Sequence, residues 1–594
     1  MNYPVSEYRK KVRGCFIGKS VGGTLGMPFE GNLNVNEVTY YDPVPTSMVA
    51  NDDLDLQVVA LEILRRRGLP VTAHYLCELW QKNVQCCPDE YGVANNNTTI
   101  GLFAPLSGKY SSKFGAGMGA AIRSELWACL APADPDLAVS LAREDAATDH
   151  FDDGVDACLF LTAVESYAFV ESDCRKLIEK GLSYITGNRR MTSAFTDTIA
   201  WWDETHDALQ VRAKILEKYP SHNWTDVTIN LSLILLSWLA GGGDFSKSIC
   251  TAASLGYDAD CTCATLGAIL GLIDVDSIEE RWTWPIGEDL VLSDNIVGMH
   301  EGATITSFCD QIFETCAEIQ AFYGSSCKLE GEIPEYTGAP AWTRRADVVA
   351  LAADYEPTLS IAAVTPLVIK LIYPEKVAVM TGEKTRFTLR LGNPTERPCQ
   401  GTFSLRAPDG FVAEGDGEFF LAAGEQADYP IFVTIPQRLR KRAYYNPLDI
   451  RFAMDDVSWS VTCGLVAPIT WLMDGKETDV PGPIASFGPG AHTFEGEFKL
   501  FTRRTDDRLV AQGTRPLSCE LDGEVLTDHD DKQYVPAIHR CKDSVVVNLD
   551  HCWHRVKVEI REGNNQEGEF MFLLGDRYSW MWLTQLEWRV PQAH

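Results

Sequence analysis

Two short acidic motifs, about two hundred residues apart, each come directly before a stretch with helical apolar spacing. The first is Asn51-Asp52-Asp53 and the second is Asp258-Ala259-Asp260. Clustered carboxylates repel one another, and a cation between them relieves that repulsion. Their hard oxygen atoms suit Mg²⁺, Mn²⁺ or Ca²⁺ better than soft or redox metals. If the two motifs meet in the fold, we therefore expect them to share a divalent cation.

Helix capping is the alternative explanation for either motif alone. After the first motif, apolar residues at helical spacing run from Leu54 to Leu64, and Gly68 ends the stretch. After the second, a Gly- and Ala-rich stretch spans residues 264–271. Asp is favoured at such positions because its oxygens accept from unpaired N–H groups and its charge suits the helix dipole. One motif leaves the two explanations about equal, whereas two motifs in one helical region favour the cation.

Composition narrows the classes of partner. The 594-residue chain has a formal net charge of -31, which argues against a nucleic-acid duplex or an anionic membrane as its partner. Its 18 cysteines are scattered and show no paired zinc spacing; the close sets are Cys86-Cys87 and Cys261-Thr262-Cys263. The longest apolar run, residues 231–240, is too short to span a bilayer, and the N-terminus has no cleavable signal pattern. We expect a cytoplasmic protein with reduced thiols.

The spacing of apolar residues predicts a multidomain chain. Residues 1–325 form an all-helical domain, with helices expected at 137–146, 155–169, 173–185, 209–218, 229–239 and 304–323. Residues 326–365, which contain Pro334, Pro340 and Pro357, form a connecting segment. The period then changes to two, which predicts an immunoglobulin-like β-sandwich over 366–466 and a jelly-roll-like (galactose-binding-like) β domain over 467–594. The tryptophans of the last domain (Trp553, Trp580, Trp582 and Trp588) are better explained as core than as sugar-stacking residues.

An ordered set of segments resembles the ADP-ribosylglycohydrolase family, the dinitrogenase-reductase-activating glycohydrolase type. The segments are residues 14–18 with 22–30, 51–53, 117–123, 148–150, and 256–261 with Gly267 and Gly271. The resemblance covers roughly residues 10–325. It implies an all-helical hydrolase with two Mg²⁺ ions between the two acidic motifs.

The same resemblance assigns the metal ligands. Carried over to this sequence, they are Asn51, Asp52, Asp53, Asp258, Asp260 and Cys261. The family has a hydroxyl residue where this chain has Asn51 and Cys261. An asparagine can still offer a carbonyl oxygen, whereas a thiol is a poor match for Mg²⁺. We therefore expect one or two Mg²⁺ ions, with Mn²⁺ or Ca²⁺ as alternatives.

Further site residues follow from the matched segments. Glu30 matches a glutamate on a mobile loop and is expected to act as an acid/base, with Asp53 as the second catalytic carboxylate. His150 matches a residue of the ribose pocket, although a structural hydrogen-bonding role is equally consistent. Arg123 either positions an anionic group or pairs with Glu125. Gly117 and Gly119 are expected to let a loop approach phosphates or a sugar through backbone N–H groups.

Residues 95–97, with Asn96 at the centre, are predicted to form a polar loop suited to sugar hydroxyls, although a plain turn explains them equally well. Two positions also differ from the family's usual residues: Gly23 stands where the family has Asp, and Met118 where it has Asn. These differences, together with the long β-rich extension, predict a member redirected from ADP-ribose to a ribosyl or other furanosyl glycoside.

Two alternatives of other classes remain open at the level of sequence. The first is a non-catalytic sugar- or nucleotide-binding protein that retains the fold, which Asn51 and Cys261 favour. The second makes the β domains an oligomerisation platform, so that the protein is a homo-oligomer. In either enzymatic or binding form, the expected partner is a small-molecule glycoside or an ADP-ribosyl group.

Overall fold

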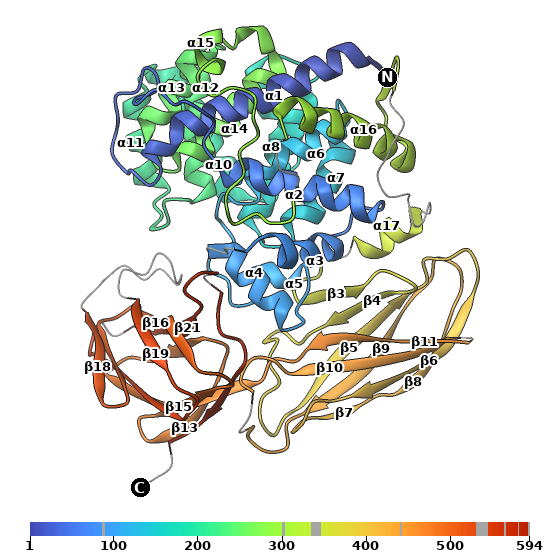
Figure 1. Cartoon of the computed structure of the whole chain (residues 1–594), viewed down its shortest axis with the longest axis vertical. Coiled ribbons are helices and arrows are strands. Elements are labelled where there is room, and N and C mark those ends of the chain that lie inside the picture. Colours follow the sequence, from blue (N-terminus) through green and yellow to red (C-terminus); the bar gives the residue numbers. More distant parts are fainter. Residues whose placement is uncertain are drawn as a thin grey trace. The chain divides into compact units, whose positions relative to one another are not determined.

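The computed structural model describes residues 1–85, 89–299, 303–333, 346–353, 355–439, 442–454, 456–529, 544–563, 566–579 and 581–591 (Figure 1). The chain forms two compact units. Unit 1 comprises Met1–Val84 and Phe114–Arg344, and unit 2 comprises Gln85–Lys113 and Arg345–His594. Five residues used in the sequence-based predictions lie outside the described ranges: Cys86, Cys87, Pro334, Pro340 and Trp580.

Unit 1 is helical, as the sequence predicts. Its helices are α1 (Val5–Gly26), η1 (Met27–Phe29), α2 (Asp52–Arg67), α3 (Ala73–Asn83), η2 (Ala121–Arg123), α6 (Ser124–Leu130), α7 (Pro135–Ala146), α8 (Asp153–Tyr167), α9 (Cys174–Leu182), α10 (Arg189–Thr205), α11 (Ala208–Lys218), α12 (Val227–Gly241), α13 (Phe245–Leu255), α14 (Ala259–Ile273), η3 (Val275–Ser277), α15 (Glu280–Thr283) and α16 (Ile305–Tyr323). Its two short strands, β1 (Asn2–Pro4) and β2 (Lys328–Glu330), pair in parallel. Each predicted helix is present, and the largest difference is that α9 ends three residues earlier than predicted (182 instead of 185).

Helices α1 and α14 pack with their backbones in close contact (Figure 1). A Cβ atom added to Gly18 would lie 2.1 Å from the carbonyl oxygen of Gly267, and one added to Gly14 would lie 2.2 Å from that of Gly271. The contact continues from Gly22 to Cys263 and from Gly26 to Ala259. We call this contact the glycine seam. The four-residue spacing keeps these positions on one face of each helix. The seam brings the C-terminal end of α1 beside the N-terminal end of α14, where the second acidic motif lies.

Unit 2 contains a first pair of β-sheets that share an apolar core. One sheet has the strand order β3-β4-β5-β9-β7 and the other β11-β10-β6-β8. Their bounds are β3 (Leu359–Ala363), β4 (Val368–Ile372), β5 (Lys384–Gly392), β6 (Cys399–Arg406), β7 (Val412–Glu414), β8 (Gly417–Leu421), β9 (Gln426–Thr434), β10 (Pro447–Met454) and β11 (Val457–Gly464). The predicted alternating run at 386–391 lies in β5, where Phe387, Leu389 and Leu391 are buried and the residues between them are more exposed.

A second pair of sheets completes unit 2. The larger has the order β13-β12-β15-β20-β17-β18, with β22 also paired to β15, and the smaller has the order β14-β21-β16-β19. The strands are β12 (Pro468–Met473), β13 (Lys476–Pro481), β14 (Ile484–Phe487), β15 (His492–Leu500), β16 (Arg504–Gly513), β17 (Leu517–Leu521), β18 (Glu524–His529), β19 (Val545–Leu549), β20 (His554–Ile560), β21 (Gly568–Gly575) and β22 (Leu586–Arg589). Trp588 is buried in their common core, as predicted, whereas Trp553 and Trp582 are half-buried.

Three helices also belong to unit 2: α4 (Asp89–Thr99), α5 (Leu106–Lys109) and α17 (Ala346–Ala352). Residues 85–113, which the sequence places in the helical domain, thus group with the β-rich part of the chain. The reason is apolar packing, because Ile100, Leu102 and Leu106 join the core of the first sheet pair. Among the described residues, no helix is both long and apolar enough to cross a membrane.

The glycine seam predicts a sharp dependence on side-chain size. Gly18→Ala should lower the free energy of unfolding of unit 1 by about 3 kcal/mol, because the new methyl group would overlap the Gly267 carbonyl and force the helices apart. Scanning calorimetry of the full chain would measure the shift. Gly187→Ala is the matched control: Gly187 is exposed with open space around it, so its change should be under about 0.5 kcal/mol. Equal stability of the two variants would contradict the seam.

Candidate active site

The three residues of the first acidic motif have different roles in the fold. Asn51 is the N-cap of α2, and its Oδ1 accepts a hydrogen bond of 2.7 Å from the backbone N–H of Asp53. The side chain of Asp53 is buried, with 1% of the residue exposed, whereas Asp52 is exposed. Asn51 therefore satisfies the helix N-terminus, and capping does not account for the buried carboxylate of Asp53.

Capping does not account for the second motif either. Asp258 occupies the N-cap position of α14 but its side chain makes no capping hydrogen bond. Its backbone N–H donates to Asn230 Oδ1 over 3.1 Å. Asp258 and Asp260 are each only 2% exposed. Two buried carboxylates at one helix end need another partner, since an unpaired buried charge is costly.

The two motifs come together at the end of the glycine seam. Ligand atoms of Asp53, Asp260 and Cys261 lie within 4.8 Å of one another, and the same limit holds for Glu30, Asp258 and Asp260. We call these five residues the carboxylate cluster. Asp52, which the resemblance includes among the ligands, belongs to neither of these two groups.

Two oxygen atoms of the cluster have no hydrogen-bond partner. Asp53 Oδ2 and Asp260 Oδ1 are buried and unpartnered among the described residues. Such groups are rare in folded proteins and call for an explanation, for which an ion is one of the standard sources. Hard carboxylate oxygens that converge in this way fit a divalent cation such as Mg²⁺.

The electrostatics of the cluster agree with that fit. Burial raises the pKa of Asp258 and Asp260 well above the usual range of a carboxyl group. Repulsion from Asp53 and Glu30 raises both pKa values further. A bound cation reverses this effect, because its charge stabilises the ionised carboxylates.

Cys261 supplies no hard ligand to the cluster. Burial is the main cause that raises the pKa of its thiol well above the usual range, and the nearby acidic groups raise this pKa further. The thiol is therefore protonated, and neutral sulfur is a weak partner for Mg²⁺. The neighbouring Thr262 does not replace it, since its hydroxyl donates to the carbonyl oxygen of Ala259 over 3.2 Å.

Glu30 lies on a loop that is hydrogen-bonded to the second motif. The N–H of Gly31 donates to the carbonyl of Tyr257 over 2.8 Å, and the N–H of Tyr257 donates to the carbonyl of Asn32 over 2.8 Å. Tyr257 has a φ of 68°, an unfavourable backbone conformation for a bulky residue. These bonds hold the exposed Glu30 next to Asp258 and Asp260.

Two departures from the family's residues are coupled in space. Asn51 Nδ2 donates to Asp260 Oδ2 over 3.4 Å. A Cβ atom on Gly23 would lie 2.9 Å from that same Nδ2. Gly23 therefore leaves the space that the Asn51 amide occupies. Because Asn51 uses its oxygen as a helix cap and turns its NH₂ group toward the cluster, its carbonyl is not directed at a cation as the sequence predicts.

Arg123 has no donor left for a substrate. Its five N–H groups donate to the side chains of Asp145 and Asp149, to the carbonyl of Asp145 and to the carbonyl of Gly119. Arg123 is 1% exposed and lies over the ring of Trp80, 5.0 Å from its centroid. The proposed role in positioning an anionic group is therefore not supported by this geometry.

Glu125, the expected partner of Arg123, pairs instead with Lys19 at 2.8 Å. Lys19 also contacts Asp53 Oδ1 at 3.3 Å, yet the sequence-based prediction missed it. The available signal was its position: a lysine inside the apolar stretch Phe16–Val21 of a buried helix must have an acidic partner.

The remaining predicted residues lie around the Arg123 network. His150 is 1% exposed, and its Nδ1 lies at ion-pair distance, 2.9 Å, from Asp149 Oδ1. The N–H of Gly117 donates to the carbonyl of Phe114, so it is not available to a phosphate. The carbonyl of Gly119 accepts from Arg123.

Asn96 does not lie in a loop. Residues 95–97 belong to helix α4 of unit 2, and Asn96 is 1% exposed. Its Oδ1 accepts from the backbone N–H of Trp582 over 3.1 Å. Both the predicted loop and its alternative, a plain turn, are wrong here: Asn is common in turns, but tertiary packing holds this triplet in a helix.

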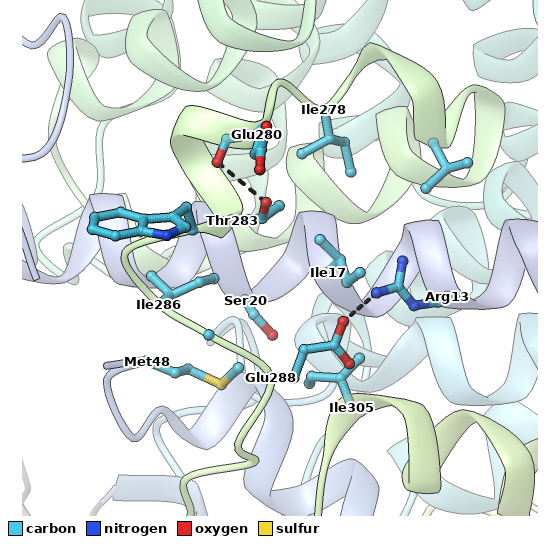
Figure 2. A pocket seen from close by; sticks show the side chains of 13 residues that line it. Arg13, Ile17, Ser20, Met48, Ile278, Glu280, Thr283, Ile286, Glu288 and Ile305 are labelled. Atoms are coloured by element: carbon cyan, nitrogen blue, oxygen red, sulfur yellow. Dashed lines mark hydrogen bonds and ion pairs between the residues drawn. The ribbon is translucent and has the colours of Figure 1, made fainter. Parts of the chain in front are cut away.

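A separate cavity of about 450 Å³ lies along the middle of α1. Figure 2 shows Arg13 and Ile17 of α1 facing Glu288 and Ile305, with Arg13 and Glu288 forming an ion pair. Its lining includes none of the residues of the carboxylate cluster. The cavity and the carboxylate cluster are therefore two distinct features of unit 1.

The buried Arg123 network predicts a pH-dependent stability. Burial alone would raise the pKa of Asp149, but the Arg123 guanidinium and the His150 ring hold it well below the usual range. The stabilisation that ionised Asp149 gives to the folded state is therefore complete above the unfolded pKa of about 3.9. It is lost as the pH falls below that value. Asp149→Asn should cost about 3–5 kcal/mol at pH 7, and the difference from wild type should narrow below about pH 4. Urea unfolding across pH measures this.

The matched control is Asp203→Asn. Asp203 pairs with Arg175 at the surface, where both side chains are half-exposed, so its removal should change stability little at any pH. A constant difference between Asp149→Asn and wild type down to pH 2 would contradict the assigned cause.

Comparison with known proteins matches most of unit 1 to a protein family. The family model described as ADP-ribosylglycohydrolase matches residues 4–320. Among solved structures, an "ADP-ribosylglycohydrolase-related protein complex" is 21% identical over 48% of this chain and 94% of its own, with a TM-score of 0.36. An anti-sigma factor domain-containing protein from Clostridium clariflavum is 10% identical over 34% of this chain and 83% of its own (TM-score 0.15). An α-L-rhamnosidase from Aspergillus terreus is 12% identical over 38% of this chain and 29% of its own (TM-score 0.16).

No curated protein matches the chain. The structural likenesses have low TM-scores, so the assignment rests on the family match. That match covers a little over half of the chain and includes both acidic motifs, Glu30 and the glycine seam. The chain therefore belongs to the ADP-ribosylglycohydrolase family.

Proposed function

We propose that this protein is a metal-dependent glycoside hydrolase that cleaves an N- or O-linked ribosyl or other furanosyl-type bond. The observation that carries the proposal is the pair of buried, unpartnered oxygens, Asp53 Oδ2 and Asp260 Oδ1, beside the exposed carboxyl of Glu30. Family membership supports hydrolysis as the general class of reaction. Asp53 and Asp260 would hold the Mg²⁺ ion, with Asp258 at the same cluster.

The residues of the chain have separate roles in this proposal. When bound, a divalent cation supplies positive charge that orients a sugar diol and polarises water. Glu30 donates a proton to the leaving nitrogen or oxygen as its bond to the anomeric carbon breaks. A water molecule then adds to that carbon and returns a proton to Glu30. Glu30 suits this role because it is exposed while the Asp residues of the cluster are buried.

The proposed substrate is a furanosyl glycoside and not an ADP-ribosyl protein. Position 118, where the family has Asn, carries a buried Met that offers no hydrogen bond to a phosphate. Arg123 and the N–H of Gly117 are also used internally. The region expected to contact a diphosphate therefore has few donors, which favours a sugar without that group.

A non-catalytic sugar- or nucleotide-binding protein is the second candidate. It is favoured by Asn51, whose oxygen caps α2, and by Cys261, whose thiol is protonated. Glu30 and the buried Asp residues oppose it. The two candidates differ in turnover, because a binding protein would hold a glycoside without releasing the sugar.

Activity assays would test the substrate class. With Mg²⁺ present, the full chain should hydrolyse one or more aryl furanosides and leave ADP-ribosyl-arginine and ADP-ribosyl-serine intact, because donors for the diphosphate are lacking. Sugar release from each substrate is measured by chromatography. Efficient cleavage of the ADP-ribosyl substrates would contradict the redirection, and a lack of turnover on every substrate would favour the binding protein.

Two variants separate proton transfer from metal binding. Glu30→Gln should lower kcat about a thousandfold while Mg²⁺ binding measured by calorimetry persists, because Asp53 and Asp260 remain. Asp260→Asn should abolish Mg²⁺ binding. Glu37→Gln, which changes an exposed carboxylate on the same loop, is the matched control and should leave both properties unchanged. Full activity of Glu30→Gln would contradict its role as the acid.

A further inference from the structure

A lysine ammonium is built into the wall of the carboxylate cluster. Lys19 lies in the middle of α1 and is 2% exposed. Its Nζ lies 2.8 Å from Glu125 Oε1, 3.1 Å from the carbonyl of Ile122 and 3.3 Å from Asp53 Oδ1. An ammonium has three N–H donors, so these three acceptors satisfy it completely.

The ammonium is held in place from its far side. Gln57 Nε2 donates to Glu125 Oε2 over 2.8 Å, and Gln57 Oε1 accepts from the N–H of Leu126 over 2.9 Å. Glu125 is fully buried. Lys19 is therefore fixed between Glu125 and Asp53, with no route for its long side chain to reach solvent.

Protein donors occupy one oxygen on each of the two facing carboxylates. Lys19 contacts Asp53 Oδ1, and Asn51 Nδ2 donates to Asp260 Oδ2. Asp53 Oδ2 and Asp260 Oδ1 are the oxygens without a partner among the described residues. Each carboxylate thus has one oxygen directed to an N–H group and one left for a cation.

We propose that Lys19 acts as a permanent cation of this centre and, together with Asn51, limits it to one divalent ion held by Asp53 Oδ2 and Asp260 Oδ1. The inference rests on the proposed function, since it concerns the ion of that same site. Two physical effects support it. An ammonium next to Asp53 repels any second ion that would share this carboxylate, and the N–H groups occupy the oxygens that such an ion would need.

The arrangement also departs from the two-ion centre that the family resemblance implies. Gly23 allows the Asn51 amide to point at Asp260, because a side chain at position 23 would collide with it. Lys19 and Gly23 lie one turn apart on the same helix. A single helix therefore supplies both features that replace an ion: a positive charge and the space for an amide donor.

Manganese binding to the full chain tests the proposal. Calorimetry gives the number of Mn²⁺ ions bound, and electron paramagnetic resonance distinguishes an isolated ion from an exchange-coupled pair. Wild type should bind one ion with the spectrum of an isolated Mn²⁺. The double variant Lys19→Met/Glu125→Gln removes the ammonium together with its nearer carboxylate partner, so Glu125 is not left as an unpaired buried charge and Asp53 Oδ1 becomes available to a cation. It should bind a second ion and give the coupled spectrum.

Lys11→Met is the matched control. Lys11 lies on the same helix, but its Nζ donates to backbone carbonyls of Ala168, Leu272 and Ile273. This variant should keep one isolated ion, and a second ion here would overturn the specific role of Lys19.

The outcomes separate this inference from the function on which it rests. Two coupled ions in wild type would overturn the Lys19 inference and leave metal-dependent hydrolysis intact. One ion in both wild type and the double variant would likewise overturn the role of Lys19. No bound ion in wild type at saturating Mn²⁺ would overturn both. The wild-type measurement decides between one and two ions even if the double variant fails to fold.

Discussion

The close backbone contact of α1 and α14 is the constraint on which the candidate site depends. With glycines at 14 and 18 meeting glycines at 271 and 267, the two helices approach more closely than side chains would allow. This contact fixes the end of α1 next to the start of α14. The Glu30 loop then reaches the loop of Tyr257 and forms two hydrogen bonds with it, which brings Glu30 beside Asp258. The proposed acid/base residue, Glu30, and the buried carboxylates are neighbours because the helices beneath them are in contact.

Buried charge is handled in two different ways in unit 1. Around Arg123 all five N–H groups of the guanidinium meet carboxylate or carbonyl oxygens, although Asp145 Oδ1 is buried without a hydrogen-bond partner among the described residues. Around Asp53 and Asp260 one oxygen of each carboxylate lacks a partner among the described residues, and Asp260 also lies within 4.8 Å of ligand atoms of Asp258 and Glu30. Lys19 compensates only part of the acidic charge. Pairing with a guanidinium accounts for the carboxylates of the first network, whereas several carboxylates that converge without such a cation suit a bound metal ion. The proposed function is therefore placed at the second network.

The helices and the change to β-structure could be predicted from the sequence, because apolar spacing is a local property. The meeting of the two acidic motifs is not local, and only the family resemblance implied it. The partner of each buried charged residue could not be predicted from the sequence. Arg123 lies two residues from Glu125, yet its partners are residues 145 and 149, since tertiary packing and not sequence distance selects them. The helical state of residues 95–97 was missed because it depends on packing within unit 2. Lys19 shows the same limit: its position in an apolar stretch indicates a buried partner but does not identify Asp53 and Glu125.

The central claim is that the two acidic motifs share a divalent cation, and anomalous diffraction tests it most directly. Crystals of the full chain would be soaked in Mn²⁺, and data would be collected at the manganese absorption edge. The account predicts an anomalous peak for a Mn²⁺ ion at bonding distance from Asp53 Oδ2 and Asp260 Oδ1. An absence of anomalous density at the carboxylate cluster, in crystals at saturating Mn²⁺, would contradict it.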